Sequence, residues 1–467
     1  MDFRRDRVTA LAQQVRSKEL SATELTQHSL RMIEERNGDI NAFVAVDAEK
    51  ALEQAAAIDQ IVASGGDPGP LAGIPIGVKD LEDAAGFRTT NGSPIFADAP
   101  PAPTDSILIG RLRQAGCVVI GKTNTPDFGW TARTENSLFG LTLNPWNREH
   151  SAGGSSGGSA AALAAGMVPL ATGTDGGGSI RIPSAACGLS GMKSSFGRVP
   201  SGGSQPPNWL DLSTKGPMAR SINDIAAALE VVVGPDQSDL SSLPRPEASW
   251  RDAVVDAHLP ARVGWAPTLG YADVDREVLT ACEHALVAFE ELGVEVVEIE
   301  GPFEKDCVNE WLTIVGACLA RSLSEHSEHP RYAELDETLQ LIIQGGTHMS
   351  AIDLVNAFDA SHFLNLKLVE LFHSVRILVT PTMAGVAPPT NLGGNGLING
   401  EETVNWVQMT YPFNMTHSPA ATVCVGQSST GVPIGIQLIG PQHADLVVLR
   451  AAAALEAALG FESVAAF

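Results

Sequence analysis

The stretch that decides the fold is Thr174-Asp175-Gly176-Gly177-Gly178-Ser179-Ile180-Arg181-Ile182-Pro183, in which three glycines precede a serine. Glycine has no Cβ, so backbone N–H groups in such a run can approach a reacting carbonyl group closely. The apolar residues 169–173 before it predict a strand. The pattern therefore favours a reactive serine on a tight turn at the end of a strand.

Two further stretches complete this pattern. The first is Pro75-Ile76-Gly77-Val78-Lys79-Asp80, where a lysine ends an apolar, strand-like run. The second is Gly153-Gly154-Ser155-Ser156-Gly157-Gly158-Ser159. A lysine can act as a base if burial lowers its pKa from the usual value of about 10.4. Together the three stretches predict an acyl-transfer site that contains no histidine.

These stretches resemble the signature of the amidase signature family of serine hydrolases. The resemblance spans nearly the whole chain, and its blocks occur in the family's order: 71–80, 121–129, 144–147, 153–183 and 431–440. It implies that Ser179 is the nucleophile and Lys79 the general base. It also implies that Ser155 follows a cis peptide bond and relays protons, and that the oxyanion hole consists of Gly176, Gly177, Gly178 and the Ser179 amide.

Each of these roles has an alternative that the residues leave open. Ser179 could simply cap a helix, and Lys79 could be a strand-end lysine paired with Asp80. Ser156 would inherit the relay if the register slipped by one residue. The family often has a larger apolar residue where this chain has Gly176, so that glycine should either loosen the turn or enlarge the pocket. By resemblance, Asp175 and Arg181 tie the loop to its neighbours as supporting residues.

Composition limits the partners. The formal charge of −24 argues against nucleic acid and anionic membranes. The first residues lack an apolar signal segment, and no stretch approaches the roughly 18 apolar residues of a membrane span. The six cysteines are scattered, which fits reduced thiols in a cytoplasmic protein. We expect no cofactor and no metal site; the partner is a small-molecule substrate, and a homodimer is left open.

Alternating strand and helix patterns predict an α/β fold with a mixed, largely parallel central sheet covered by helices on both faces. We expect one amidase signature domain over 1–467. The mostly helical residues 303–373 should form a cap within it. Residues 383–402 are rich in Gly, Pro and Asn, which is typical of a long functional or mobile loop.

The predicted function is hydrolysis of carboxylic amides, and also of esters and carbamates (urethanes), through a Ser179 acyl-enzyme. Aromatic and apolar residues in the segments expected to shape the pocket favour uncharged, apolar or aryl substrates; the pocket candidates are Trp209, Trp406, Tyr411 and His417. The alternative is a glutaminase-type subunit of a tRNA-dependent amidotransferase. Those relatives carry an acidic residue before the closing Asn block, whereas residues 405–414 contain none.

Overall fold

The computed structural model describes residues 1–467 except 205, 208, 256–258, 463 and 467. Its centre is an eleven-stranded sheet with the order β1-β3-β2-β4-β6-β5-β12-β13-β9-β7-β8. The strands of this sheet are β1 (Phe43–Val46), β2 (Pro75–Lys79), β3 (Val118–Thr123), β4 (Leu170–Asp175), β5 (Ser190–Lys193), β6 (Thr214–Ala219), β7 (Arg262–Trp265), β8 (Glu295–Glu298), β9 (Ile377–Pro381), β12 (Ala420–Gln427) and β13 (Pro433–Ile439).

The predicted mixed α/β sheet is confirmed, but parallel pairing does not dominate it. Parallel pairs join β3, β2 and β4 near one end of the sheet and β9, β7 and β8 at the other. The strands between these blocks pair antiparallel. Alternation of helix and strand signals predicted the mixed sheet but not the strands β5, β6 and β12, which carry much of its antiparallel middle.

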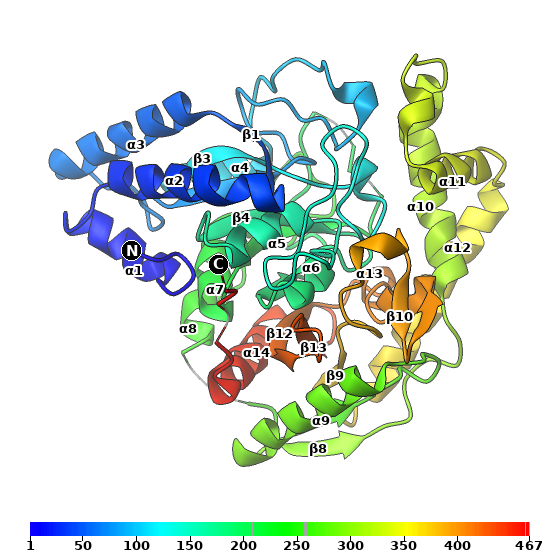
Figure 1. Ribbon diagram of the computed structural model, residues 1–467. Helices are drawn as coiled ribbons and strands as arrows, with labels where there is room; N and C mark the ends of the chain where they lie inside the picture. The colour runs from blue at the N-terminus through cyan, green and yellow to red at the C-terminus, as the bar shows by residue number, and fades with distance from the viewer. Residues whose placement is uncertain (205, 208, 256–258, 463, 467) are drawn as a thin grey trace.

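Helices surround the sheet (Figure 1). Ser21 caps the helix that begins at Ala22: its Oγ accepts from the Glu24 N–H at 3.0 Å, and its own N–H donates to the Glu24 carboxylate at 2.8 Å. The helices outside residues 303–373 are α1 (Val8–Arg16), α2 (Ala22–Ile40), α3 (Ala48–Ala63), α4 (Ile107–Gln114), α5 (Gly157–Ala164), α6 (Arg181–Ala186), α7 (Ile222–Val232), α8 (Trp250–Ala253), α9 (Arg276–Glu291), α13 (Pro412–Met415) and α14 (Asp445–Leu459). Among the described residues, no helix is both long and apolar enough to cross a membrane.

Residues 303–373 contain three longer helices, α10 (Val308–Leu323), α11 (Glu337–Thr347) and α12 (Ala351–Leu371). They stand together on the side of the molecule away from α1–α3 (Figure 1). Their contacts form a second apolar cluster, separate from the main core, that includes Ile314, Leu319, Leu339 and Ile343. This segment is helical, as expected; that it acts as a cap within a single domain stays a prediction.

The expected loop 383–402 contains a small hairpin. Strand β10 (Gly396–Ile398) pairs antiparallel with β11 (Glu401–Thr403), and Asn399 and Gly400 form the turn with φ of 52° and 86°. Two consecutive positive φ angles are what a two-residue hairpin turn requires, and Asn-Gly is its preferred sequence. This dipeptide was the sequence signal that could have revealed the hairpin.

Part of the core is built from small side chains. Every residue of α5 is buried, so alanine and glycine bring this helix close to the sheet. Strands β1 and β3 are neighbours in the sheet and also pack closely. A Cβ at Gly121 on β3 would collide with the carbonyl oxygen of Ala45 on β1. Gly426 on β12 is a contrasting strand glycine, because nothing lies within 4 Å of the place a Cβ would occupy.

These two glycines give a matched test of the close packing. We expect Gly121→Ala to lower the free energy of unfolding by about 1–3 kcal/mol, because the backbone of β1 must move away. Gly426→Ala should change it by less than about 0.5 kcal/mol. Chemical denaturation of both variants measures the difference, and equal stabilities would contradict this account of the core.

Candidate active site

Lys79 is the centre of a hydroxyl cluster. It ends β2, and its side chain is fully buried. Its Nζ lies 2.8 Å from Ser155 Oγ, 2.8 Å from Ser156 Oγ and 2.9 Å from Thr174 Oγ1. The alternative pairing with Asp80 does not form, because Asp80 is in an ion pair with Lys122 at 3.1 Å.

Burial lowers the pKa of Lys79 to about 7, although the negative charges of Asp175 and Glu82 act in the opposite direction. A neutral amine has two N–H groups and one lone pair. Three hydroxyl partners therefore fit the neutral form if one hydroxyl donates to Nζ and two accept from it. The site can thus hold an uncharged lysine near neutral pH, which is the requirement for a general base.

The two adjacent serines differ in what their hydroxyls can do. Ser156 Oγ, which is buried, donates to the Thr174 carbonyl at 3.4 Å and accepts from the Thr174 N–H at 3.4 Å. Ser155 Oγ has Lys79 as its one hydrogen-bond partner among the described residues. A cis peptide bond joins Gly154 to Ser155. Ser155 therefore has a free hydroxyl position next to the lysine, and Ser156 does not.

Ser179 lies in the turn between the glycine run that follows β4 and the start of α6. Its backbone carbonyl accepts from the Ser156 N–H at 3.3 Å, which holds the two glycine-rich loops together. Within the described residues, its Oγ makes no hydrogen bond, and the residue is partly exposed. The structure thus brings Lys79 and Ser155 into contact and leaves the Ser179 hydroxyl accessible without a bond to Ser155.

The backbone amides of the glycine run are not equivalent. The N–H of Gly178 donates to Asp175 Oδ1 at 2.8 Å, so it is occupied inside the loop. No acceptor for the N–H groups of Gly176, Gly177 or Ser179 is present in the described part of the chain. Gly178 was expected among the oxyanion donors, and its bond to Asp175 removes it from the available set.

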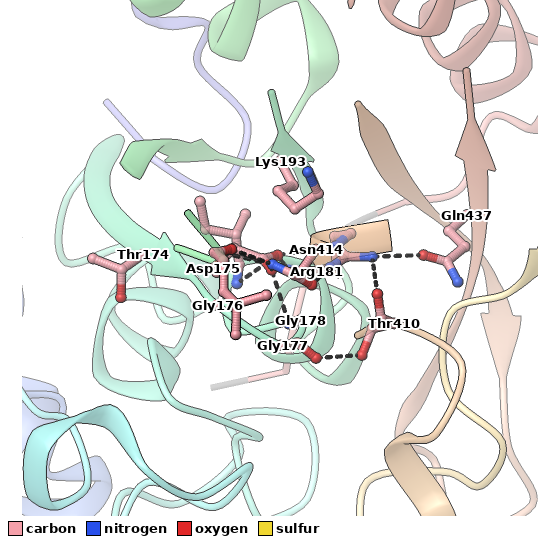
Figure 2. Close-up of polar contacts among 12 residues, drawn as sticks. Thr174, Asp175, Gly176, Gly177, Gly178, Arg181, Lys193, Thr410, Asn414 and Gln437 are labelled. Atoms are coloured by element: carbon pink, nitrogen blue, oxygen red, sulfur yellow. Dashed lines mark hydrogen bonds and ion pairs between the residues drawn. The ribbon is translucent and has the colours of Figure 1, made fainter. Parts of the chain in front are cut away.

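Asp175 and Arg181 support this loop from the buried side (Figure 2). Both side chains are fully buried and form a two-point ion pair, with Nε to Oδ2 and Nη2 to Oδ1 at 2.9 Å each. Burial alone would raise the pKa of Asp175, but the charge and hydrogen bonds of Arg181 outweigh it and hold this pKa well below its usual range. The supporting contacts predicted for both residues are present.

The pair is fastened to the C-terminal part of the chain. Arg181 donates to the Thr410 carbonyl at 3.0 Å, to Gln437 Oε1 at 3.1 Å and to Asn414 Oδ1 at 2.7 Å. Asn414 in turn donates to Asp175 Oδ1 at 2.9 Å. Sequence reasoning did not single out Asn414, Thr410 or Gln437, although Asn414 and Thr410 lie in the closing Asn block and Gln437 in the last matched strand.

An aromatic cluster stands over Gly176 and Gly177. Trp311 of α10 stacks on Tyr411 and on Trp130, with ring centroids 5.6 Å and 6.3 Å apart, and meets Trp209 edge to face at 6.0 Å. Trp209 and Tyr411 were predicted pocket residues. Trp130 and Trp311 were missed, because only the fold brings residues so far apart in sequence together.

The same cluster answers the question raised by Gly176. A Cβ at Gly176 would lie 2.5 Å from the ring of Trp209, so the indole occupies the space of the larger residue found in the family. The space beside Gly176 is therefore filled by Trp209 and does not enlarge the pocket. The glycine makes room for Trp209 directly against the loop.

The other two pocket candidates lie elsewhere. Trp406 is 1% exposed, donates to the Gly394 carbonyl at 3.1 Å and packs beneath the hairpin β10–β11. His417 Nε2 lies 3.1 Å from Asp211 Oδ2, and the ring packs against Phe196. Neither ring is part of the aromatic cluster, so Trp406 belongs to the hairpin core and His417 to a neighbouring polar contact.

Comparison with known proteins places this geometry in a family. The model of the family described as Amidase matches residues 24–449. An acylamidase from Rhodococcus erythropolis is 36% identical over 96% of this chain and 94% of its own length. One of the subunits of the glutamyl-tRNA(Gln) amidotransferase from Synechococcus sp. (strain CC9605) is 34% identical over 94% of each chain.

Solved structures support the same family assignment. The crystal structure of a bacterial aryl acylamidase of the amidase signature enzymes has a TM-score of 0.90 and 30% identity, covering 97% of this chain and 96% of that one. A 6-aminohexanoate cyclic dimer hydrolase, complexed with substrate, has a TM-score of 0.89 and 29% identity over 99% and 98% of the two chains. Because sequence and structure agree over almost the full length, the protein belongs to the amidase signature family and is an amidase-family hydrolase.

Proposed function

We propose that this protein hydrolyses linear amides, together with esters and carbamates, of uncharged apolar or aryl compounds through an acyl-enzyme on Ser179. The observation that carries the proposal is the fully buried Lys79, whose Nζ lies 2.8 Å from Ser155 Oγ. A buried amine beside an otherwise unoccupied hydroxyl is a means of moving a proton without histidine.

In the proposed reaction, neutral Lys79 accepts the proton of Ser155 while Ser155 accepts that of Ser179. Ser179 Oγ then bonds to the substrate carbonyl carbon. When the C–N bond breaks, Ser155 gives a proton to the leaving amine and recovers one from Lys79. Water next attacks the acyl carbon, and its proton returns through Ser155 as Ser179 leaves. The Ser155–Ser179 hydrogen bond must form when substrate binds, since contacts of this kind often tighten only in the complex.

The developing oxyanion is proposed to lie on backbone N–H groups of the glycine run. Gly177 and Ser179 are the preferred donors, with Gly176 as a third, because these amides have no acceptor in the described residues. The N–H of Gly178 serves the loop instead, through Asp175. Fixed donors of this kind stabilise the transition state because they need no reorganisation during the reaction.

The aromatic cluster supports the proposed substrate class. The rings of Trp209 and Trp311 lie next to Gly176 and Gly177, and Trp130 and Tyr411 stack on Trp311. Aromatic rings offer a flat aryl group offset-stacked or edge-to-face contacts of about 0.5–1.5 kcal/mol each. The names of the similar acylamidase and aryl acylamidase point in the same direction.

The amidotransferase subunit is the second candidate, because relatives of that name are 34% identical. An acid that could bind an amino group is absent from residues 405–414. Asp306 does reach Tyr411 from residues 303–373, accepting its hydroxyl at 2.7 Å, but burial raises the pKa of Asp306. Asp306 is thus already engaged by the Tyr411 hydroxyl, and residues 405–414 supply no acid of their own, which favours the first proposal.

A substrate panel tests this choice. We expect anilides to be hydrolysed with a kcat/KM at least about tenfold above that of aliphatic amides with the same acyl group, because the aryl ring gains stacking contacts. Glutamine should not be hydrolysed. Efficient release of ammonia from glutamine, with no turnover of anilides, would instead support the amidotransferase role.

The nucleophile can be identified directly. Ser179→Ala should reduce hydrolysis of amides and esters by at least about 10⁴-fold while the thermal midpoint stays unchanged, because alanine fits the same space. A fluorophosphonate probe followed by peptide mapping should label Ser179 in the native protein and leave Ser156 unlabelled. A probe adduct on Ser156 in the native protein would refute the assignment.

The base is tested by comparing leaving groups. Lys79→Ala should reduce the hydrolysis of an anilide more than that of the p-nitrophenyl ester with the same acyl group, because an amine must be protonated to leave and a phenolate need not be. Equal losses on both substrates would show that Lys79 only supports the fold.

The pH profile gives a second measure of the same group. Because the reactive form of Lys79 is the neutral one and its pKa is lowered to about 7, kcat/KM should rise between pH 5 and pH 8 and then level off. A rate that is flat from pH 5 to pH 9 would contradict a base with this pKa.

A further inference from the structure

Trp311 connects the helical segment 303–373 to the glycine run. Its Nε1 donates a hydrogen bond to the Gly176 carbonyl at 2.9 Å. Its ring lies so close to Gly177 that a Cβ there would be 2.6 Å from Cζ2. One side chain of α10 therefore contacts the backbone of both residues that flank the 176–177 peptide bond.

This contact fixes the direction of one amide. The carbonyl of Gly176 and the N–H of Gly177 belong to the same planar peptide unit, and in a trans unit they point in opposite directions. A hydrogen bond that holds the Gly176 carbonyl toward Trp311 therefore holds the Gly177 N–H pointing away from Trp311. That N–H has no acceptor among the described residues, so it is available to a ligand.

The next two peptide units are held from other parts of the fold. Thr410 Oγ1 donates to the Gly177 carbonyl at 2.6 Å, which directs the occupied N–H of Gly178 (Figure 2). The Gly178 carbonyl accepts from the Ile182 N–H at 2.7 Å, which directs the N–H of Ser179. Of these three peptide units, the one that carries the Gly177 N–H is held by a side chain from residues 303–373.

Trp311 is itself held in place by its neighbours. It lies between Trp130 and Tyr411, and these rings are anchored through hydrogen bonds. Trp130 Nε1 donates to Thr338 Oγ1 at 2.7 Å, and the Tyr411 hydroxyl donates to Asp306 Oδ1 at 2.7 Å. The indole N–H is thus aimed at the Gly176 carbonyl.

We propose that Trp311 is a positioning residue for catalysis: through the Gly176 carbonyl it orients the Gly177 N–H toward the substrate oxyanion. The inference rests on the proposed function. It assigns to residues 303–373 a direct part in transition-state stabilisation, in addition to any part in substrate binding. The expected signature is a loss in kcat with little change in KM, because the oxyanion charge develops only in the transition state.

The test deletes the indole N–H and keeps an aromatic ring. Two variants do this: Trp311→Phe, and replacement of the Trp311 indole by the isosteric benzothiophene, which preserves the bicyclic shape if phenylalanine packs poorly. The matched control is Trp146→Phe. Trp146 Nε1 makes the same kind of bond, to the Cys187 carbonyl at 2.7 Å, but away from the glycine run. The substrates are an anilide and a p-nitrophenyl ester with the same acyl group.

Both Trp311 variants should reduce kcat on both substrates by about 10–100-fold, which is at or below the loss on deleting an oxyanion donor outright. KM should stay within about twofold. A boronic acid whose organic group matches that of the acyl group mimics the tetrahedral intermediate, and its inhibition constant should rise by the same factor as kcat falls. Trp146→Phe should keep kcat within about twofold. A benzothiophene variant with unchanged kcat, or a change confined to KM, would overturn the inference.

Failure of the proposed function would look different. If hydrolysis by the native protein did not depend on Ser179, the reaction scheme and this inference would both fall. If native hydrolysis depends on Ser179 and the Trp311 variants keep their kcat, only the role of Trp311 is refuted.

Discussion

The buried ion pair between Asp175 and Arg181 is the constraint on which the site depends. A carboxylate taken entirely out of water is costly unless its oxygens are fully hydrogen-bonded. Here Arg181, Asn414 and the Gly178 N–H all donate to Asp175 at 2.9 Å or less. Removing one partner of such a pair typically costs about 3–5 kcal/mol. The same contacts that satisfy this charge therefore determine the path of the chain through the glycine run.

This arrangement also affects the lysine. Burial favours the neutral form of Lys79, while the carboxylates of Asp175 and Glu82 favour the charged form. Because burial is the larger effect, the pKa of Lys79 comes to about 7, and the negative charges keep it from falling further. The positive charge of Arg181 offsets part of the negative charge of Asp175, which limits how far Asp175 can raise the pKa of Lys79. The pKa of the proposed base thus results from opposing electrostatic effects in one buried region.

Local patterns in the sequence predicted the α/β class. Through the resemblance to the amidase signature family, the sequence also implied that Lys79 acts with Ser155 and that Asp175 and Arg181 support the loop, and both pairs are in contact in the structure. It missed features created by long-range packing: the antiparallel middle strands, and the meeting of Trp130 and Trp311, which lie on segments far apart in sequence. Trp406 was misplaced for a different reason. An aromatic residue after a glycine-rich loop suggested a pocket, but the Asn399-Gly400 turn folds that loop into a hairpin that buries it.

The glycine run is held from two sides by different kinds of group. On the inner side, Asp175 occupies the Gly178 N–H, and Arg181 and Asn414 hold Asp175; on the outer side, Trp209 and Trp311 pack on Gly176 and Gly177. The outer contact is possible only because Gly176 and Gly177 have no Cβ. The rings of Trp209 and Trp311 lie too close to these two residues to leave room for one. The rings that a substrate would meet are consequently in contact with the peptide groups that would bind its oxyanion. In the proposed mechanism, a shift of Trp209 or Trp311 would therefore also alter the geometry of the peptide groups that bind the oxyanion.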